Sequence, residues 1–459
     1  MTKLFYQRGK KRDTLILNKG KTPQKDKDRS EENKMEQLME FLDKSVSPYH
    51  AVAECKRKLE ENGFEELLLS DRWNIKAEGK YYVSPYPSMV IAIRVGDVKE
   101  GETALRIGMA HTDQPMMKIK PNAEMKQKKY MKLNAEKYGG LILNTWLDRP
   151  LGISGKVVLK SETVFKPEVR FFDSKRPVLV IPNLAIHMNR DVNKGVELNP
   201  QTHMLPLFGL MGEEMDEAYF TSYLAKELGV EKEDILDYDL FAYNYEKSQK
   251  VGVKEELLLA PRIDNLASVY ALLEGIIHSK PGCNLHIAGM FDHEEVGSRS
   301  KQGADSSLLS MVVERVLTAV GVDRQGVMQA ISRGFMLSMD GAHALHPNYP
   351  EKNDPTTMTL LGDGVVIKQS GTQRYLSDSE ATGILMQICE KHAIPYQKQI
   401  NRSDVMGGQT LGPIANAYLP MMGEDLGISM LGMHSSMETA SCDDCDAFIQ
   451  FAKAYYQEA

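Results

Sequence analysis

Hydrophobic residues recur at helical spacing in several stretches of the chain. The first stretch runs from Met35 to Leu42, and after Ser47-Pro48 a second one resumes from Ala51 to Leu59. Two later stretches with the same period span Ile263–His278 and Ser306–Val320. Because apolar residues three and four positions apart share one face of a helix, each stretch predicts an amphipathic helix.

Shorter apolar runs predict buried strands. These runs are Lys80–Val83, Met89–Val95, Leu105–Ala110 and Asn284–Phe291, and turn residues bound them. Beyond position 255 such runs alternate with helical stretches, which is typical of an α/β domain.

The middle of the chain has a different pattern of hydrophobic residues. Residues 122–254 carry repeated short β-like segments and no long amphipathic helix until about Glu213. We therefore expect an inserted β-rich domain that interrupts one catalytic domain, made of residues 35–121 and 255–459. Residues 1–34 are rich in charged and amide side chains and cannot bury much of themselves, so we expect a basic, flexible N-terminal arm.

Composition narrows the class of protein. The chain has 459 residues with 42% hydrophobic and 26% charged side chains, typical of a folded globular protein. A net charge of −7 argues against a nucleic-acid partner. No apolar run reaches the roughly 18 residues of a membrane span. Five scattered cysteines suit a reducing compartment, so we expect a cytoplasmic protein with no membrane contact.

Potential metal ligands occur at five places, each expected at a strand end or a helix start. They are His111, Asp264, Glu294-Glu295, Asp340 and His434. Each is a weak signal alone, but together they offer imidazoles and carboxylates without a thiolate. That set predicts a hydrolytic metal centre, with zinc as the leading candidate and cobalt or manganese as substitutes.

Charge balance and side-chain direction favour two ions. Two divalent cations would be neutralised by Asp264, Glu295 and Asp340 together with one hydroxide. Asp264 is our choice for a carboxylate that bridges both ions. Adjacent side chains after a strand point in different directions, so one glutamate of Glu294-Glu295 can bind metal while the other takes the proton of an attacking water.

The motifs in their order resemble the M18 metallopeptidases, the aspartyl aminopeptidase family, and this chain looks like a divergent, bacterial-type branch of it. The resemblance runs from about Ser47 to the C-terminus. It is carried by Ser-Pro-Tyr-His-Ala (47–51), Asn-Gly-Phe-Glu-Glu-Leu (62–67), His-Thr-Asp (111–113), Ile-Pro-Asn-Leu-Ala-Ile-His (181–187), Arg-Ile-Asp-Asn-Leu (262–266), Phe-Asp-His-Glu-Glu-Val-Gly-Ser (291–298), Asp-Gly-Ala-His-Ala-Leu-His-Pro-Asn-Tyr (340–349) and Met-His-Ser (433–435).

The resemblance implies an α/β fold with a central mixed β-sheet flanked by helices, and a site with two zinc ions. His111 and Asp340 would hold one ion, Glu295 and His434 the other, and Asp264 would be shared. The family's general base falls on Glu294, and Asp113 would orient His111 from behind. The family's lysine and tyrosine near the substrate fall on Lys368 and Tyr375.

The family's inserted domain forms dimers within tetrahedral dodecamers, and a histidine of the insert reaches a neighbour's active site. His187 occupies the matching position. Here the final motif reads His434-Ser-Ser-Met437-Glu438 where the family usually has His-Ser-Ile-Arg-Glu, so a positive charge is missing. The preferred N-terminal residue of the substrate therefore stays open between acidic and neutral.

The function we expect is that of a two-metal aminopeptidase that removes the N-terminal residue of short peptides, with Glu294 as general base. Two alternatives remain. One is a metal-dependent deacylase or amidohydrolase acting on a small molecule. The other is a non-catalytic shell that has kept the fold.

Overall fold

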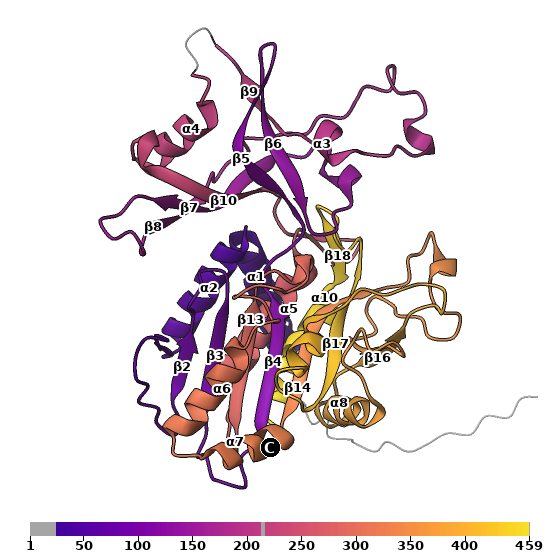
Figure 1. Cartoon of the computed structure of the whole chain (residues 1–459). Helices are drawn as coiled ribbons and strands as arrows, with labels where there is room; N and C mark the ends of the chain where they lie inside the picture. The colour runs from indigo at the N-terminus through magenta and orange to yellow at the C-terminus, as the bar shows by residue number, and fades with distance from the viewer. Residues whose placement is uncertain (1–23, 213–215, 459) are drawn as a thin grey trace, which may run out of the picture.

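Two sheets organise the computed structural model, which describes residues 24–212 and 216–458 (Figure 1). Within those residues, the larger sheet has twelve strands, and its main path follows the order β1-β2-β3-β13-β4-β14-β17-β18-β12-β11. Strand β15 pairs with β16 and β17 beside that path. The strands are β1 (Glu65–Glu66), β2 (Lys80–Val83), β3 (Val90–Val95), β4 (Leu105–His111), β11 (Gln249–Val251), β12 (Leu257–Ala260), β13 (Leu285–Phe291), β14 (Phe335–His343), β15 (Val365–Gln369), β16 (Tyr396–Ile400), β17 (Met422–Leu431) and β18 (Glu438–Ser441).

Helices cover both faces of this mixed sheet. The helices are α1 (Gln24–Lys44), α2 (Pro48–Glu61), α5 (Ile263–Ile277), α6 (Leu308–Ala319), α7 (Arg324–Ser332), α8 (Ser379–His392), α9 (Leu411–Asn416) and α10 (Cys442–Tyr455). One buried cluster joins α1, α2, α5, α8 and α10 to the sheet, and a second joins α6, α7 and α9 to it. Along β13, Ala288 belongs to the first cluster and Ile287 to the second, as expected when successive side chains point to opposite faces.

The second sheet is built from the middle of the chain and lies above the first in Figure 1. Six strands of the described chain form it in the order β8-β7-β10-β5-β6-β9. They are β5 (Met116–Gln127), β6 (Tyr130–Tyr138), β7 (Leu151–Leu159), β8 (Glu168–Asp173), β9 (Leu207–Leu210) and β10 (Ile235–Asn244), accompanied by α3 (Pro200–His203) and α4 (Tyr219–Leu228). We call residues 116–244 the insert.

Most predicted elements lie within a few residues of the observed ones, but two boundaries differ. The insert begins with β5 at Met116, before the expected position 122, and β11 already pairs with the larger sheet before position 254. Helix α1 begins at Gln24, inside the segment expected to be an arm. Its first ten residues, 24–33, are all charged or polar, and several of them are lysine, arginine or glutamate, which are good helix formers although they carry no apolar pattern. The rest of the expected arm, residues 1–23, lies outside the described residues.

The parallel pairs of the larger sheet bring several strand ends to one edge. Strand β4 runs parallel to both β13 and β14, and β14 runs parallel to β17. In this register Phe291, the last residue of β13, lies opposite His111, the last residue of β4. Polar residues at or just beyond these ends are therefore neighbours in space, where ligand sites of α/β sheets are usually found.

Candidate metal centre

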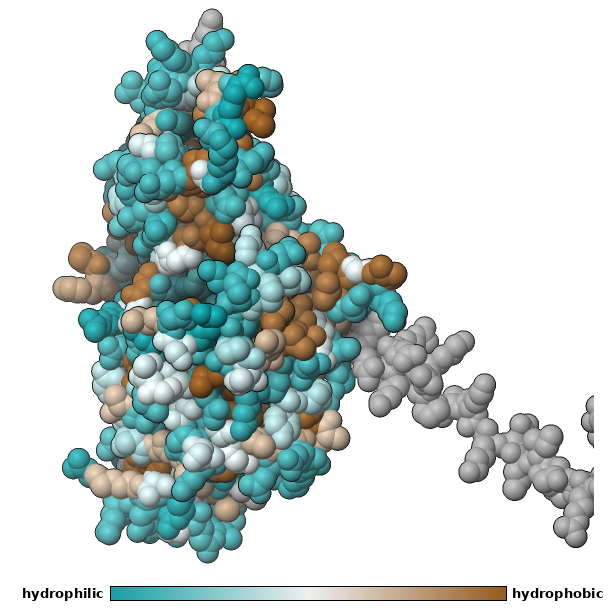
Figure 2. All heavy atoms as spheres, turned by 90° about the vertical axis from the view of Figure 1, so that its right-hand side faces the viewer, coloured by the Kyte–Doolittle hydropathy of each residue, from teal (hydrophilic) through white to brown (hydrophobic). Residues whose placement is uncertain are grey.

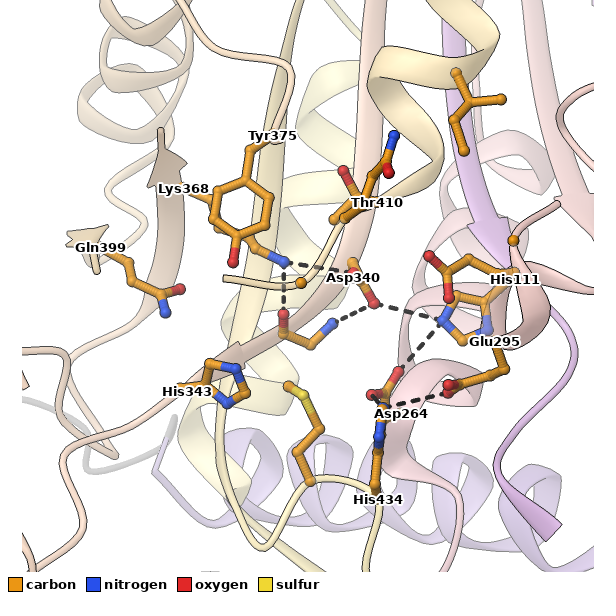
Figure 3. A pocket seen from close by; sticks show the side chains of 17 residues that line it. His111, Asp264, Glu295, Asp340, His343, Lys368, Tyr375, Gln399, Thr410 and His434 are labelled. Carbon is orange, nitrogen blue, oxygen red and sulfur yellow. Dashed lines mark hydrogen bonds and ion pairs between the residues drawn. The ribbon is translucent and has the colours of Figure 1, made fainter. Parts of the chain in front are cut away.

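Side chains from five separate segments meet in one cavity at this edge (Figure 3). The cavity has a volume of about 490 Å³. Its lining includes all five predicted ligand residues and the predicted base: His111, Asp264, Glu294, Glu295, Asp340 and His434. Lys368 and Tyr375 also line it, whereas His187 does not and lies in an exposed part of the insert.

Asp264 lies between the two imidazoles. Its Oδ1 is 3.4 Å from His111 Nε2, and its Oδ2 is 3.5 Å from His434 Nε2. Each imidazole has a second carboxylate beside the same nitrogen, because Asp340 Oδ1 is 3.5 Å from His111 Nε2 and Glu295 Oε1 is 3.4 Å from His434 Nε2. The potential ligand atoms thus form three groups of three: two of them share Asp264, and the third joins His111 to Glu294 and Glu295.

Backbone carbonyls fix the tautomers of both histidines. His111 Nδ1 lies 2.9 Å from the carbonyl oxygen of Asp113, and His434 Nδ1 lies 3.1 Å from that of Gly140. A carbonyl oxygen can only accept, so each Nδ1 carries a proton, and each Nε2 faces the carboxylates, where it can bind a metal ion once it is deprotonated. This is the arrangement in which metal-binding imidazoles are commonly held.

The carboxylate of Asp113 connects the back of His111 to the rest of the site. Its Oδ1 is 3.4 Å from His111 Nδ1, farther than the residue's own carbonyl oxygen. The same carboxylate accepts hydrogen bonds from the backbone N–H groups of Glu294 and Glu295, at 3.1 and 3.2 Å, and from the hydroxyl of Tyr138 at 2.7 Å. Asp113 therefore holds the turn that carries both glutamates as well as the imidazole.

Crowded carboxylates shift the pKa values of the site. Burial raises the pKa of Glu294 to about 8, and nearby carboxylates such as Asp340 add to the rise. Burial also raises the pKa of Glu295 well above its usual range, and Asp264 adds to that effect. Burial opposes ionisation of Asp264 too, but the two imidazoles beside it hold its pKa far below the usual range.

The donor set fits divalent cations. Asp264 Oδ1 and Glu295 Oε1 are buried and have no hydrogen-bond partner in the described part of the protein. Buried oxygens of this kind are costly unless something positive satisfies them. Two imidazole nitrogens and three carboxylates, of which Asp264 faces both imidazoles, are ligands that zinc accepts, and a bound cation would relieve the repulsion among the acids.

Lys368 is held at the wall of the cavity. Its ammonium donates to the carbonyl oxygen of Gly341 at 2.7 Å and lies 3.4 Å from Asp340 Oδ2. It also lies 4.6 Å from the centre of the Tyr375 ring. Burial would lower the pKa of Lys368, but Asp340 outweighs this effect, so the net shift is upward and the side chain is a fixed positive charge beside the ligands.

Residues of the insert complete the site, and sequence patterns did not reveal them. Tyr138 closes β6 and Gly140 follows it, yet both contact residues of the larger sheet. An ordinary tyrosine and a glycine in a turn carry no local signal of such a role. Only the return of the insert onto the strand ends shows it.

A cavity with two imidazoles and clustered carboxylates at the strand ends of a mixed sheet is typical of metal-dependent hydrolases. The family model described as Aminopeptidase I zinc metalloprotease (M18) matches residues 41–456. The chain belongs to this family, and it is a zinc metallo-aminopeptidase, a hydrolase. The family and fold class predicted from the sequence are thereby confirmed.

Individual relatives agree with this assignment. A probable M18 family aminopeptidase 2 from Clostridium novyi is 42% identical over 422 residues, which cover 92% of this chain and 98% of the relative. Its counterpart from Pseudomonas entomophila is 35% identical over 92% of this chain and 97% of the relative.

Solved structures share the fold. A chain of the Ape4 and Nbr1 complex superposes with a TM-score of 0.89 at 30% identity, covering 93% of this chain and 86% of that one. The M18 aminopeptidase from Thermotoga maritima superposes with a TM-score of 0.83 at 20% identity, over 98% of this chain and all of that one, a likeness of fold alone.

Proposed function

We propose that this chain hydrolyses the N-terminal residue of short peptides with two divalent metal ions, zinc in the first instance. The observation that carries the proposal is the position of Asp264, whose two oxygens face two different imidazoles. His111, Asp340 and Asp264 would hold one ion, and His434, Glu295 and Asp264 the other. Cobalt or manganese could take the same ligands.

Two such ions would polarise the scissile carbonyl and lower the pKa of the attacking water. The chain itself must then move a proton, and Glu294 is our candidate for that task. Its carboxylate lines the cavity and makes no hydrogen bond or ion pair with another described residue. Burial raises the pKa of Glu294, and a carboxylate made more basic in this way is a better acceptor for the proton of the attacking water, which it can later return to the leaving amine.

Lys368 and Tyr375 would position the substrate. The ammonium of Lys368 is already oriented by Asp340 and Gly341 and lies at the cavity wall. A fixed cation in a buried site stabilises a negative charge that develops on the substrate far better than a mobile one does. Asp113 acts from behind, through the imidazole of His111 and the turn of the two glutamates.

We further propose that the protein works as a homo-oligomer in the cytoplasm. The insert exposes Val164 and Phe165, which are 88% and 96% exposed, and Met188 in the segment that carries His187. Apolar side chains this exposed suit an interface between copies. A solved relative from yeast, mApe1, is a dodecamer. In such an assembly the insert would pair subunits, His187 would reach a neighbour's cavity, and entry would be limited to short peptides.

The proposal is tested with Glu294→Gln. We expect both the wild type and the variant to bind two zinc ions per chain, and the variant to lose turnover of aminoacyl anilides by about 10² to 10⁴-fold, the usual contribution of general acid–base catalysis. Glu314→Gln, on the exposed side of α6, is the matched control and should behave as the wild type. Full turnover in Glu294→Gln would remove Glu294 as the base.

Substrate panels separate the aminopeptidase from the deacylase alternative. Peptides with a free α-amine should be cleaved and their N-acetylated forms should be inert. Cleavage of the acetylated peptides would favour a deacylase or amidohydrolase. Asp, Glu, Leu, Met and Lys at the N-terminal position, tested with the same protein, distinguish an acidic preference from a neutral one.

A further inference from the structure

Glu438 is buried beneath the two segments that carry Asp264 and His434. It begins β18, is 2% exposed, and both of its carboxylate oxygens accept a backbone N–H. Oε2 accepts from the N–H of Asp264 at 3.0 Å, and Oε1 accepts from the N–H of His434 at 2.8 Å. One carboxylate thus connects the main chains of two potential metal ligands.

The register of the sheet explains this contact. Strand β12 pairs antiparallel with β18, and its last residue, Ala260, lies opposite Glu438. The chain that leaves β12 therefore passes the Glu438 side chain as it enters α5. The turn from β17 to β18 runs through His434 and returns to the sheet at Glu438. Glu438 therefore lies beside both segments, the one that carries Asp264 and the one that carries His434.

Both segments contain a residue in the left-handed region. Arg262 has a φ of +64° and His434 a φ of +66°. A residue other than glycine pays on the order of 1 kcal/mol of free energy to adopt this backbone conformation. It stays there only when the surrounding structure holds it. The two hydrogen bonds to Glu438 act on those two segments.

We propose that Glu438 is a positioning residue that fixes Asp264 relative to His434 and so sets the geometry of the metal pair. The inference rests on the proposed two-metal function. Glu438 belongs to none of the groups of potential ligand atoms among the described residues, so we do not count it as a ligand. It does not line the substrate cavity either, and faces instead a void of about 20 Å³ behind Asp264. Its influence must pass through the ligands.

The test uses Glu438→Gln. The amide has almost the same size, but it keeps one acceptor and places an N–H₂ donor against the other backbone N–H. Asp444→Asn is the matched control: Asp444 is 1% exposed, its Oδ2 and Oδ1 accept the N–H groups of Gly362 and Gly364 at 2.7 and 2.8 Å, and it does not line the metal cavity. Both variants lose the same kind of hydrogen bond.

The readouts are the zinc dissociation constants, from competition with a chromogenic chelator, and the visible absorption bands of the cobalt-loaded protein. We expect Glu438→Gln to bind zinc about 10- to 100-fold more weakly, the usual effect of disturbing the support of a ligand, and to shift the cobalt bands. Asp444→Asn should keep wild-type affinity and bands even if both variants unfold at a lower temperature.

Unchanged zinc affinity in Glu438→Gln, or an equal loss in both variants, would overturn the proposal. If Glu438→Gln does not fold, Glu438→Asp serves instead, because its carboxylate is one methylene too short to meet both N–H groups and should also weaken zinc binding. Failure of the two-metal function would show differently, as a wild-type protein that binds other than two ions per chain.

Discussion

The two imidazoles of the site are supported in different ways. The side chain of His111 is 2% exposed and its Nδ1 is held by Asp113, two residues along the same segment. The side chain of His434 is 30% exposed, and its Nδ1 donates to Gly140, which belongs to the insert. The insert therefore contacts both ends in different ways: at the His111 end Tyr138 acts through Asp113, and at the His434 end Gly140 contacts the imidazole itself.

This difference has a consequence for metal binding. The imidazole of His111 is buried among the strand ends, so we expect a chelator to remove the metal ion at this end more slowly. The His434 end lies closer to solvent and depends on how the insert sits. Asp264 belongs to both ends, whereas Tyr138 supports the first and Gly140 the second. We therefore expect a variant of Asp264 to affect both ends. A variant of Tyr138 should act mainly on the His111 end, and a variant of Gly140 on the His434 end.

Asp264→Asn should have the largest effect, because it weakens both ends together. The amide keeps the size of the side chain but removes the charge shared by the two groups of ligands. We expect the zinc content to fall from two ions per chain to below one, and turnover to fall on the order of 1,000-fold or more, since several kcal/mol of electrostatic stabilisation are lost.

Elemental analysis and anilide hydrolysis measure these two quantities, with Asp444→Asn as the control for loss of a buried carboxylate. If Asp264→Asn still held two ions with wild-type affinity, Asp264 would not be the shared ligand.

Tyr138→Phe should have a smaller effect, strongest at the His111 end. The change removes the hydroxyl that donates to Asp113 and keeps the ring, which packs edge-on against Phe241. Asp113 retains two backbone N–H donors, so we expect the ion at His111 to bind about tenfold more weakly. The other ion should change less, because Asp113 reaches it only through the backbone of Glu295. Zinc titration resolves the two affinities.

Tyr82→Phe is the control, because Tyr82 donates to the Glu60 carboxylate in the same manner, and Glu60 does not line the cavity. An equal weakening of both ions in Tyr138→Phe would contradict the assignment of Tyr138 to one end.

The sequence predicted the site residues well where they lie at the ends of strands. The runs before His111 and before Glu294 were apolar enough to predict β4 and β13, and the pairing of those strands then brings their ends together. The ligands carry their own chemical signature, since imidazoles and carboxylates in this order match one family. These ligands come together because neighbouring parallel strands end at the same edge of a sheet.

The sequence was a poor guide where two distant segments meet through ordinary residues. Gly140 and His434 are 294 positions apart and touch only because the insert folds back on the sheet. Glu438 resembles a surface acid until the register of β12 and β18 places it under two ligands. The role of His187 stays a prediction, because it depends on a second copy of the chain. On the face shown in Figure 2, hydrophobic side chains gather around the middle of an otherwise largely hydrophilic surface. The periodicity of hydrophobic residues in the sequence does not predict this patch.

Gly140→Ala should have the smallest effect and only on the His434 end. A Cβ at this position would lie 3.2 Å from His434 Nδ1, so the imidazole must shift by a few tenths of an ångström. We expect metal release to a chromogenic chelator to show two phases in the wild type, the faster one from the more exposed His434 end. In Gly140→Ala the fast phase should accelerate by less than about tenfold, because the ligand is displaced and not removed. The slow phase should stay unchanged.

Gly383→Ala, where an added Cβ meets nothing within 4 Å, is the control. Equal acceleration of both phases would show that the two ends respond as one unit and would contradict the assignment of Gly140 to the His434 end.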